Sequence, residues 1–191
     1  MGLRAHGWRV AIAVAMLTCV ARPARANELP ADLEVAIHLK ILSFDDGLKE
    51  RVTANTIVIA VLYPAKDPTG ASDYVAAIAD LSEKQKVMVH GKKVRAVAVP
   101  ITGSLNDSLS GVHVLYVMGT ASADQAAAVS KIAFASKMPT LCGNRSFLSN
   151  GLAVAVVPKD NKPSIVVHAA NAAHSGMVLD SKLLRLAEVV K

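Results

Sequence analysis

The sequence predicts an α/β protein, a three-layer α/β/α sandwich with a mixed sheet of about five strands and a C-terminal antiparallel hairpin. Two observations support this fold class. Uninterrupted apolar and largely β-branched runs, such as residues 56–63, alternate with segments of helical periodicity, which is the pattern of parallel strands joined by crossover helices. Near the C-terminus, two short apolar runs are joined by a polar segment bounded by prolines, which favours a hairpin.

The first 26 residues have the pattern of a signal peptide. Arg4 and Arg9 precede an apolar run over residues 10–20, and Ala24-Arg25-Ala26 offers a small-x-small cleavage site. The apolar run is much shorter than the roughly 20 residues that span a bilayer. We therefore expect export across a membrane, cleavage near Ala26 and no membrane insertion afterwards. Cys19 has no small residue immediately before it, so we interpret it as part of the apolar run rather than as a lipidation site.

Cleavage leaves residues 27–191, which we expect to form a single domain. The apolar content of 52% is typical of a chain with a packed core. The removed segment holds four arginines and no acid, so the net charge falls from +6 to +2. This balance does not indicate nucleic-acid binding, and we interpret the basic residues within 84–95 as a solvated turn. Cys142 is then the one remaining cysteine, either buried and inert or paired in an intermolecular disulfide.

The N-terminal elements follow from apolar spacing and start or stop signals. Residues 33–42 carry apolar side chains four apart and predict an amphipathic helix that ends near residues 45–47. Residues 56–63 predict a strand buried on both faces. A helix follows with Tyr74, Ile78 and Leu81 on one face, and Ser72 or Asp73 can cap its start.

The rest of the chain continues this alternation. A capping box at Ser122 and Gln125 predicts the start of a helix that runs to about Lys137. The two hairpin strands should be joined by a six-residue connection, residues 158–163. The remaining predicted elements are strands over residues 94–99, 112–118, 140–142, 152–157 and 164–168, and helices over residues 169–174 and 181–190.

The sequence carries no motif for catalysis, a cofactor or a metal. It has no G-x-G-x-x-G, no glycine-rich loop ending in Gly-Lys-Ser/Thr and no G-x-S-x-G. The histidines do not have the spacing of metal ligands. We therefore predict a protein that is not an enzyme, with no catalytic, cofactor-binding or metal-binding residues. We expect His113 to be a hydrogen-bonded core residue, and no spacing supports a catalytic trio of His113 with Ser104 or Asp107.

A ligand, if there is one, should lie at the loops that follow the strands. In open α/β sheets ligands bind beyond the carboxyl ends of the strands, where the strand order reverses. These ends lead into residues 64–71, 101–110 and 119–123. The segment 102–111 is richest in hydroxyl and amide groups. We interpret it as a solvated connection, with a polar-ligand site as the alternative.

The C-terminal third contains three distinctive segments, FLSNGLAVAV at residues 147–156, SIVVHAANAA at residues 164–173 and GMVLDSKLLRLA at residues 176–187. These segments resemble the YfiR-like family of periplasmic regulatory proteins. VHVLYV at residues 112–117 resembles the middle strand of the family, and GKKV at residues 91–94 resembles the entry to the strand before it. The chain departs from the family in two places. It lacks the Trp-Pro that follows the first helix, and Val112 stands where the family often has cysteine.

The resemblance implies a periplasmic, non-catalytic regulator. Such a protein binds and represses a membrane-bound signalling protein, for example a diguanylate cyclase, through the partner's periplasmic domain, and thereby controls cyclic-di-GMP and biofilm formation. The resemblance also implies that the protein can form a homodimer. Redox control through disulfides is not implied for a chain with a single mature cysteine. Candidate contact regions are the first helix and residues 176–178. The alternative function is that of a periplasmic small-ligand-binding protein that uses the loops at the strand carboxyl ends.

Overall fold

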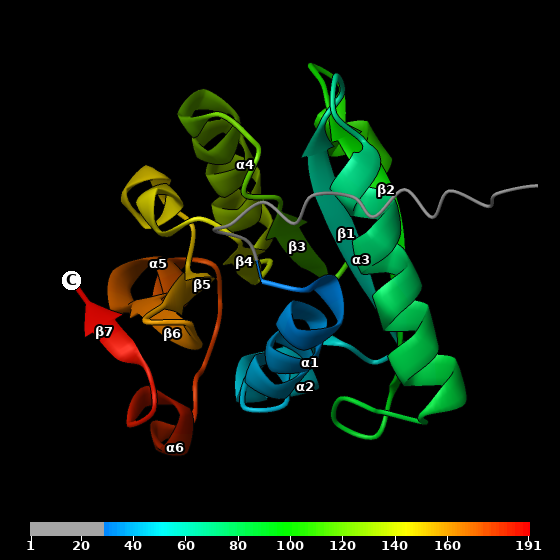
Figure 1. Ribbon diagram of the computed structural model, residues 1–191, viewed down its shortest axis with the longest axis vertical. Helices are drawn as coiled ribbons and strands as arrows, with labels where there is room; N and C mark the ends of the chain where they lie inside the picture. The colour runs from blue at the N-terminus through cyan, green and yellow to red at the C-terminus, as the bar shows by residue number, and fades with distance from the viewer. Residues whose placement is uncertain (1–28) are drawn as a thin grey trace, which may run out of the picture.

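The computed structural model describes residues 29–191, so the predicted signal peptide lies outside the described residues. Seven strands form one sheet in the order β2-β1-β3-β4-β5-β6-β7, which runs from right to left in Figure 1. Neighbours from β2 to β5 are parallel, β5 and β6 are antiparallel, and β6 and β7 are parallel. The strands are β1 (Thr56–Pro64), β2 (Lys93–Ile101), β3 (Val114–Val117), β4 (Thr140–Cys142), β5 (Val154–Lys159), β6 (Lys162–His168) and β7 (Glu188–Val190).

Helices cover both faces of this sheet. Buried side chains of α1 and α3 belong to a core cluster on one face, and those of α4, η2 and η3 belong to a second cluster on the other. The predicted mixed sheet within a three-layer α/β/α sandwich is confirmed, although the sheet has seven strands rather than about five. The helices are α1 (Ala31–Leu42), α2 (Asp46–Arg51), α3 (Thr69–Ala79), η1 (Asp80–Lys84), η2 (Leu105–Leu109), α4 (Ala123–Ser136), η3 (Arg145–Asn150), α5 (Ala169–His174) and α6 (Ser181–Leu184).

Strand β1, which lies between β2 and β3, shows why the apolar runs are uninterrupted. Ile57, Ile59 and Val61 point into the first cluster, whereas Ala60 and Leu62 point into the second. All five side chains are fully buried. Successive side chains of a strand point to opposite faces, so a strand covered on both faces must be apolar at every position.

The capping box of α4 is present as predicted. Gln125 N–H donates to Ser122 Oγ at 3.2 Å, and Ser122 N–H donates to Gln125 Oε1 at 2.9 Å. The prediction for α3 was wrong in detail. This helix begins at Thr69, directly after Pro68, so Ser72 and Asp73 lie inside the helix rather than at its cap. The earlier start buries Ala71 in the first core cluster.

The hairpin is tighter than predicted. Both prolines lie within strands and pair with each other, Pro158 opposite Pro163, so the six-residue connection is wrong. The turn consists of Asp160 and Asn161 alone, whose φ angles of 51° and 59° are left-handed. Asp and Asn tolerate this conformation, and a two-residue turn of this kind matches the twist of the strands. Because the prolines oppose each other, their missing N–H groups fall in one non-hydrogen-bonded pair.

The predicted final helix over residues 181–190 was also wrong. Helix α6 covers only Ser181–Leu184, and the chain then forms the edge strand β7. β7 pairs with the outer side of β6, with Val189 beside Val167. Arg145 also forms an ion pair with Glu188. These tertiary interactions override the helical spacing of the segment. The first helix was predicted to end near residues 45–47. It ends at Leu42, and a second helix, α2, begins at Asp46.

Candidate functional site

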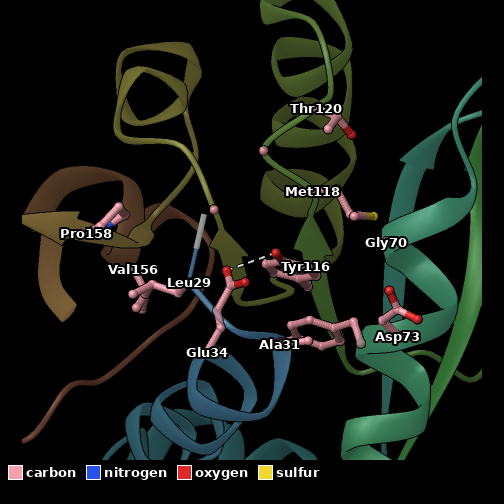
Figure 2. A pocket seen from close by; sticks show the side chains of 13 residues that line it. Leu29, Ala31, Glu34, Gly70, Asp73, Tyr116, Met118, Thr120, Val156 and Pro158 are labelled. Carbon is pink, nitrogen blue, oxygen red and sulfur yellow. Dashed lines mark hydrogen bonds between the residues drawn. The ribbon is translucent and has the colours of Figure 1, made fainter. Parts of the chain in front are cut away.

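A crevice lies where the strand order reverses. β2 and β3 pair with opposite sides of β1, so the switch point falls between β1 and β3. A cavity of about 190 Å³ opens there between α1, α3 and the ends of the strands (Figure 2). Such switch points are the usual ligand sites of open α/β sheets. We call this cavity the switch-point crevice. Its polar and aromatic lining includes Glu34, Asp73, Tyr74, Tyr116 and Thr120.

One hydrogen bond crosses the floor of the crevice. Tyr116 on β3 donates its hydroxyl to Glu34 Oε1 on α1 at 2.9 Å (Figure 2). Tyr116 is 3% exposed, and burial, followed by the charge of Glu34, raises the pKa of Tyr116 well above its ordinary value. The phenol therefore stays protonated and remains a donor.

A second pair continues this contact into the core. The ring of Tyr74 on α3 stacks on Tyr116, with centroids 4.1 Å apart. The Tyr74 hydroxyl lies 2.7 Å from Nδ1 of His38. His38 is fully buried, and burial lowers the pKa of its imidazole to about 3. The His38 side chain is therefore neutral. The contacts that link Glu34, Tyr116, Tyr74 and His38 run from the crevice into the first core cluster.

Two glycines allow the loops after β3 and β4 to approach each other. A Cβ atom at Gly119 would lie 3.1 Å from the carbonyl oxygen of Gly143. A Cβ atom at Gly143 would lie 3.2 Å from both Glu34 Oε1 and the Tyr116 hydroxyl oxygen. These distances are shorter than ordinary van der Waals contacts. A side chain at Gly143 would therefore displace the hydrogen-bonded pair.

The strand-end loops contribute unequally to the crevice. Gly70 and Thr120, from two of the three loops singled out in the sequence, line the cavity. The polar segment 102–111 does not line it. This segment contains η2, whose Leu105 and Leu109 are buried in the second core cluster. Its other eight residues are exposed, so the segment is the solvated connection that we expected, anchored by two leucines on the far face of the sheet.

The structure does not assemble the trio of His113 with Ser104 or Asp107. His113 lies beside Val58, and its Nδ1 accepts a hydrogen bond from Val58 N–H at 3.1 Å. Ser104 follows the carboxyl end of β2, whereas His113 precedes the amino end of β3. The two positions lie at opposite ends of parallel strands. His113 is hydrogen-bonded as expected, but half-buried rather than in the core.

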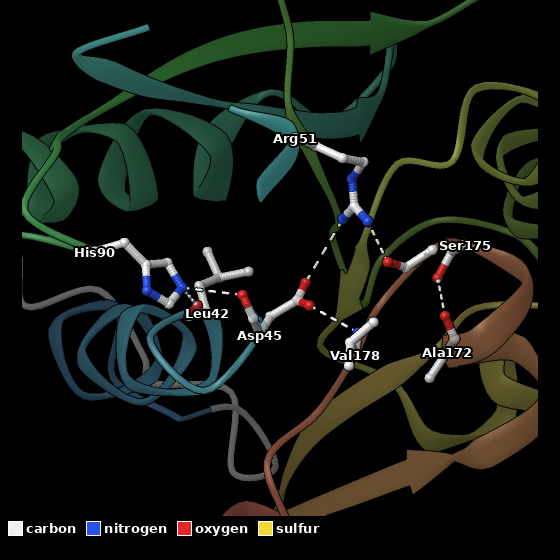
Figure 3. A network of polar contacts seen from close by, with 8 residues as sticks. Leu42, Asp45, Arg51, His90, Ala172, Ser175 and Val178 are labelled. Carbon is white, nitrogen blue, oxygen red and sulfur yellow. Dashed lines mark hydrogen bonds and ion pairs between the residues drawn. The ribbon is translucent and has the colours of Figure 1, made fainter. Parts of the chain in front are cut away.

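The residues that follow the first candidate contact region, helix α1, lie against the second, residues 176–178. Asp45 pairs with Leu179 in a β-bridge, and Asp45 Oδ1 accepts a hydrogen bond from Val178 N–H at 2.9 Å. Arg51 contacts Asp45 at 3.8 Å and donates to the carbonyl oxygen of Gly176 (Figure 3). We call residues 44–51 and 176–180 together the corner clamp.

The corner clamp combines a buried charge with an exposed apolar residue. Asp45 is fully buried; burial raises the pKa of its carboxyl group, while the Val178 N–H and the Arg51 charge oppose that shift. His90 Nε2 lies 3.0 Å from the carbonyl oxygens of both Leu42 and Asp45 (Figure 3). Met177 is buried, whereas Val178 is 59% exposed. Val178 is thus a surface apolar residue on a well-anchored segment.

The remaining cysteine is buried. Cys142 on β4 is inaccessible to solvent, and burial raises the pKa of its thiol to about 12.

Residues 29–191 contain no helix long and apolar enough to cross a membrane. No cluster of three or more His, Cys, Asp or Glu side chains suited to a metal occurs within these same residues.

Comparison with known proteins identifies the family. The model of the YfiR/HmsC-like family matches residues 31–188, and the chain belongs to this family. The YfiR/HmsC-like proteins are a family of periplasmic regulators, so the resemblance seen in the sequence is confirmed at the level of the family. None of the curated proteins compared with the chain matches it.

Two solved structures share the fold. One is a conserved domain protein from Vibrio cholerae O1 biovar El Tor, with a TM-score of 0.58, 15% identity and coverage of 85% of this chain. The other is an ABC domain in complex with L-Trp from Streptococcus pneumoniae, with a TM-score of 0.53, 18% identity and coverage of 78% of this chain. The match spans 60% of the length of each of these proteins. At these identities the likeness extends to the fold alone.

Proposed function

We propose that the protein is a periplasmic, non-catalytic regulator that binds and represses a membrane-bound signalling protein such as a diguanylate cyclase. The observation that carries this proposal is the family match over residues 31–188. The protein is exported by a signal peptide cleaved near Ala26, and residues 27–191 act as a single domain. Mass spectrometry of the exported protein tests this processing, since the mature chain should begin at Asn27.

The corner clamp is the surface proposed to contact the partner. It contains residues 176–178, one of the two predicted contact regions, and Val178 offers an exposed apolar side chain on a segment held by Asp45 and Arg51. An apolar side chain on a rigid support is suited to fill a pocket in a partner protein. We therefore expect Val178 to be an anchor of the complex.

Deletion of the gene tests the regulatory role. Loss of a repressor should raise intracellular cyclic-di-GMP and biofilm formation, and the wild-type gene should restore both. Val178→Asp should fail to restore them, whereas Val189→Asp, which alters a 46% exposed valine on β7, should succeed. Cyclic-di-GMP that stays unchanged after deletion under several growth conditions would argue against the proposal. Affinity capture from the periplasm then identifies the membrane partner.

A second candidate function is periplasmic small-ligand binding, with or without a protein partner. The specific observation in its favour is the switch-point crevice, which lies beyond the carboxyl ends of the strands. Binding to the native state raises the melting temperature as ligand concentration exceeds Kd. Thermal-shift measurements against panels of small metabolites test this function, and the absence of any stabilisation would count against it.

A further inference from the structure

We propose that the outer edge of β2 binds an extended segment of a partner protein in which apolar and acidic residues alternate. The segment would add a further strand to the seven-stranded sheet, one end of which is formed by β2 (Figure 1). This inference goes beyond the proposed function, because it concerns a surface other than the corner clamp. It follows from the free backbone groups, the groove and the charges along this edge.

The backbone groups of β2 point alternately to β1 and to the open side. Lys93 N–H donates to the carbonyl oxygen of Asn55, just before β1, at 3.1 Å. Val94 N–H instead donates to Ser82 Oγ on η1 at 3.2 Å. Because consecutive residues of a strand direct their backbone groups to opposite sides, the odd-numbered residues of β2 bond to β1. The even-numbered residues point outward.

The outward groups that stay free form a short stretch. Pro100 has no N–H, which fits an edge position, because proline within a sheet favours edge strands. Ala96 and Ala98 have no outward partner within the described chain, since β2 pairs with β1 alone, and Ala98 is exposed. Their N–H and C=O groups are therefore available to an added strand, as in β-augmentation.

A groove beside this edge has room for side chains. Its volume is about 350 Å³, and its lining on the helix side includes Val75 and Ala79 of α3. Val94 and Ala96 also line it, and they belong to the face of the sheet that α3 covers. Every second side chain of an added strand would point to this same face. These side chains should therefore be apolar.

The opposite face of the edge is basic. Lys93 and Arg95 alternate with Val94, so their exposed side chains point to the face of the second core cluster. Neither forms an ion pair within residues 29–191. Of the described residues that line the groove, these two are basic and Glu83 on η1 is acidic. Carboxylates on this face of an added strand would pair with the two free cations, and opposite charges on neighbouring strands attract each other.

A second copy of the chain is a poorer occupant of the edge. The strand KVRAVAVPI contains two basic residues and no acid, so β2 of another copy brings no carboxylate to Lys93 or Arg95. Charged side chains on an edge strand also discourage pairing between like strands. The charge of this edge therefore favours an acidic segment over a second β2.

Titration with three capped synthetic peptides tests the proposal on the exported protein. The probe is acetyl-Gly-Val-Glu-Val-Glu-Val-Gly-amide. One control replaces both glutamates with lysine, and the other regroups the central residues as Val-Val-Val-Glu-Glu, which removes the alternation. In two-dimensional NMR spectra the probe should shift the amide signals of Ala96 and Ala98 saturably, with a Kd at least tenfold lower than that of either control. At saturation, hydrogen exchange of both amides should slow about tenfold, whereas that of Val97, which faces β1, should not change.

Three variants separate the charge of the edge from its backbone. Arg95→Glu reverses a charge and should weaken probe binding at least tenfold while strengthening that of the lysine peptide. Lys131→Glu makes a similar change at an exposed position of α4 that does not line the groove, and it should leave both Kd values within twofold. Ala98→Pro removes an outward donor but no bond to β1, and it should also weaken the probe at least tenfold. Circular dichroism establishes that each variant folds, and Arg95→Glu decides the outcome if Ala98→Pro does not fold.

Several results would overturn the proposal. These are unshifted signals of Ala96 and Ala98 up to about 5 mM probe, equal binding of the lysine peptide, and a Kd that Arg95→Glu leaves unchanged. Slow exchange of both amides without peptide, together with a dimer in sedimentation velocity, would assign the edge to a second copy instead. The regulatory role is judged independently, by cyclic-di-GMP in the deletion strain.

Discussion

The hydroxyl of Tyr116 on β3 donates a 2.9 Å hydrogen bond to Glu34 on α1, a residue 82 positions earlier in the chain. This bond fastens the first helix of the domain to the centre of the sheet, at the floor of the switch-point crevice. Tyr116 lies almost completely out of solvent, so the bond forms in a medium that strengthens it. Removing it should be measurable in the stability of the protein.

Tyr116→Phe should lower the free energy of unfolding by about 1 kcal/mol, the usual contribution of one hydrogen bond. Urea denaturation monitored by circular dichroism measures the loss. Tyr63→Phe is the control, because Tyr63 is only partly buried and its hydroxyl has no hydrogen bond within the described chain. Equal losses in the two variants would show that the Glu34 contact contributes nothing to stability.

A methyl group at residue 143 should disturb the same contact from another side. The Cβ atom of Gly143→Ala would lie 3.2 Å from both partners of the hydrogen bond, and overpacking of this kind costs about 1–3 kcal/mol. At Gly103 a Cβ atom meets nothing within 4 Å. Gly103→Ala should therefore leave the melting temperature unchanged or raise it slightly. Identical melting temperatures for the two variants would contradict the crowding seen at Gly143.

Much of the fold was predictable from local patterns. The parallel strands appeared as apolar runs because both faces of β1 and β3 are buried, and the start of α4 was visible in its capping box. The C-terminal edge strand was not predictable, since Leu183, Ala187 and Val190 have helical spacing, whereas residues 188–190 pair with β6. Pairing with a distant strand leaves no signal in the local sequence.

The crevice was predictable in position but not in composition. The rule for strand carboxyl ends pointed to the segments that hold Gly70, at the start of α3, and Thr120. The rule could not identify Glu34, because this residue lies on a helix that precedes the first strand. It also pointed to the segment 102–111, which is a solvated connection held by two buried leucines and does not line the cavity. Only the three-dimensional packing of α1 against β3 brings Glu34 and Tyr116 together.

His38 should make stability depend on pH in the mildly acidic range. Its pKa is about 3 in the folded protein, against about 6.5 in an unfolded chain. Below pH 6.5 the unfolded state therefore binds a proton that the folded state does not bind. Stability should fall as pH decreases from 6.5 towards 3, with a slope approaching about 1.4 kcal/mol per pH unit.

Unfolding free energies at several pH values measure this effect. His38→Gln removes the titrating group while keeping an acceptor for Tyr74, and it should flatten the dependence between pH 6.5 and pH 4. His174→Gln, at an exposed position, should preserve the slope of the wild type. A slope that persists in His38→Gln would assign the effect to other groups.

Asp45 should hold the two parts of the corner clamp together. Asp45→Ala removes the acceptor of the Val178 N–H and the partner of Arg51, and we expect a loss of about 3 kcal/mol. The amides of Asp46 and Val178, which bond within the clamp, should exchange with deuterium faster. Asp46→Ala alters the exposed neighbouring carboxylate and should cost less than about 1 kcal/mol. Slow exchange of Val178 in Asp45→Ala would mean that the segment is held by its backbone alone.

Cys142 should be unreactive in the folded protein. With a thiol pKa of about 12, roughly one molecule in ten thousand carries the thiolate at pH 8, and the thiolate is the reactive form. Burial also blocks access, because the side chain is fully inaccessible on β4. An aromatic disulfide reagent should therefore modify the native protein at least a hundredfold more slowly than the protein in denaturant. A positive control is Gly103→Cys in a Cys142→Ala background, since position 103 is open, and its thiol should react rapidly without denaturant. Rapid modification of native Cys142, or a disulfide-linked dimer on a non-reducing gel, would contradict the buried thiol and restore the intermolecular disulfide as the alternative.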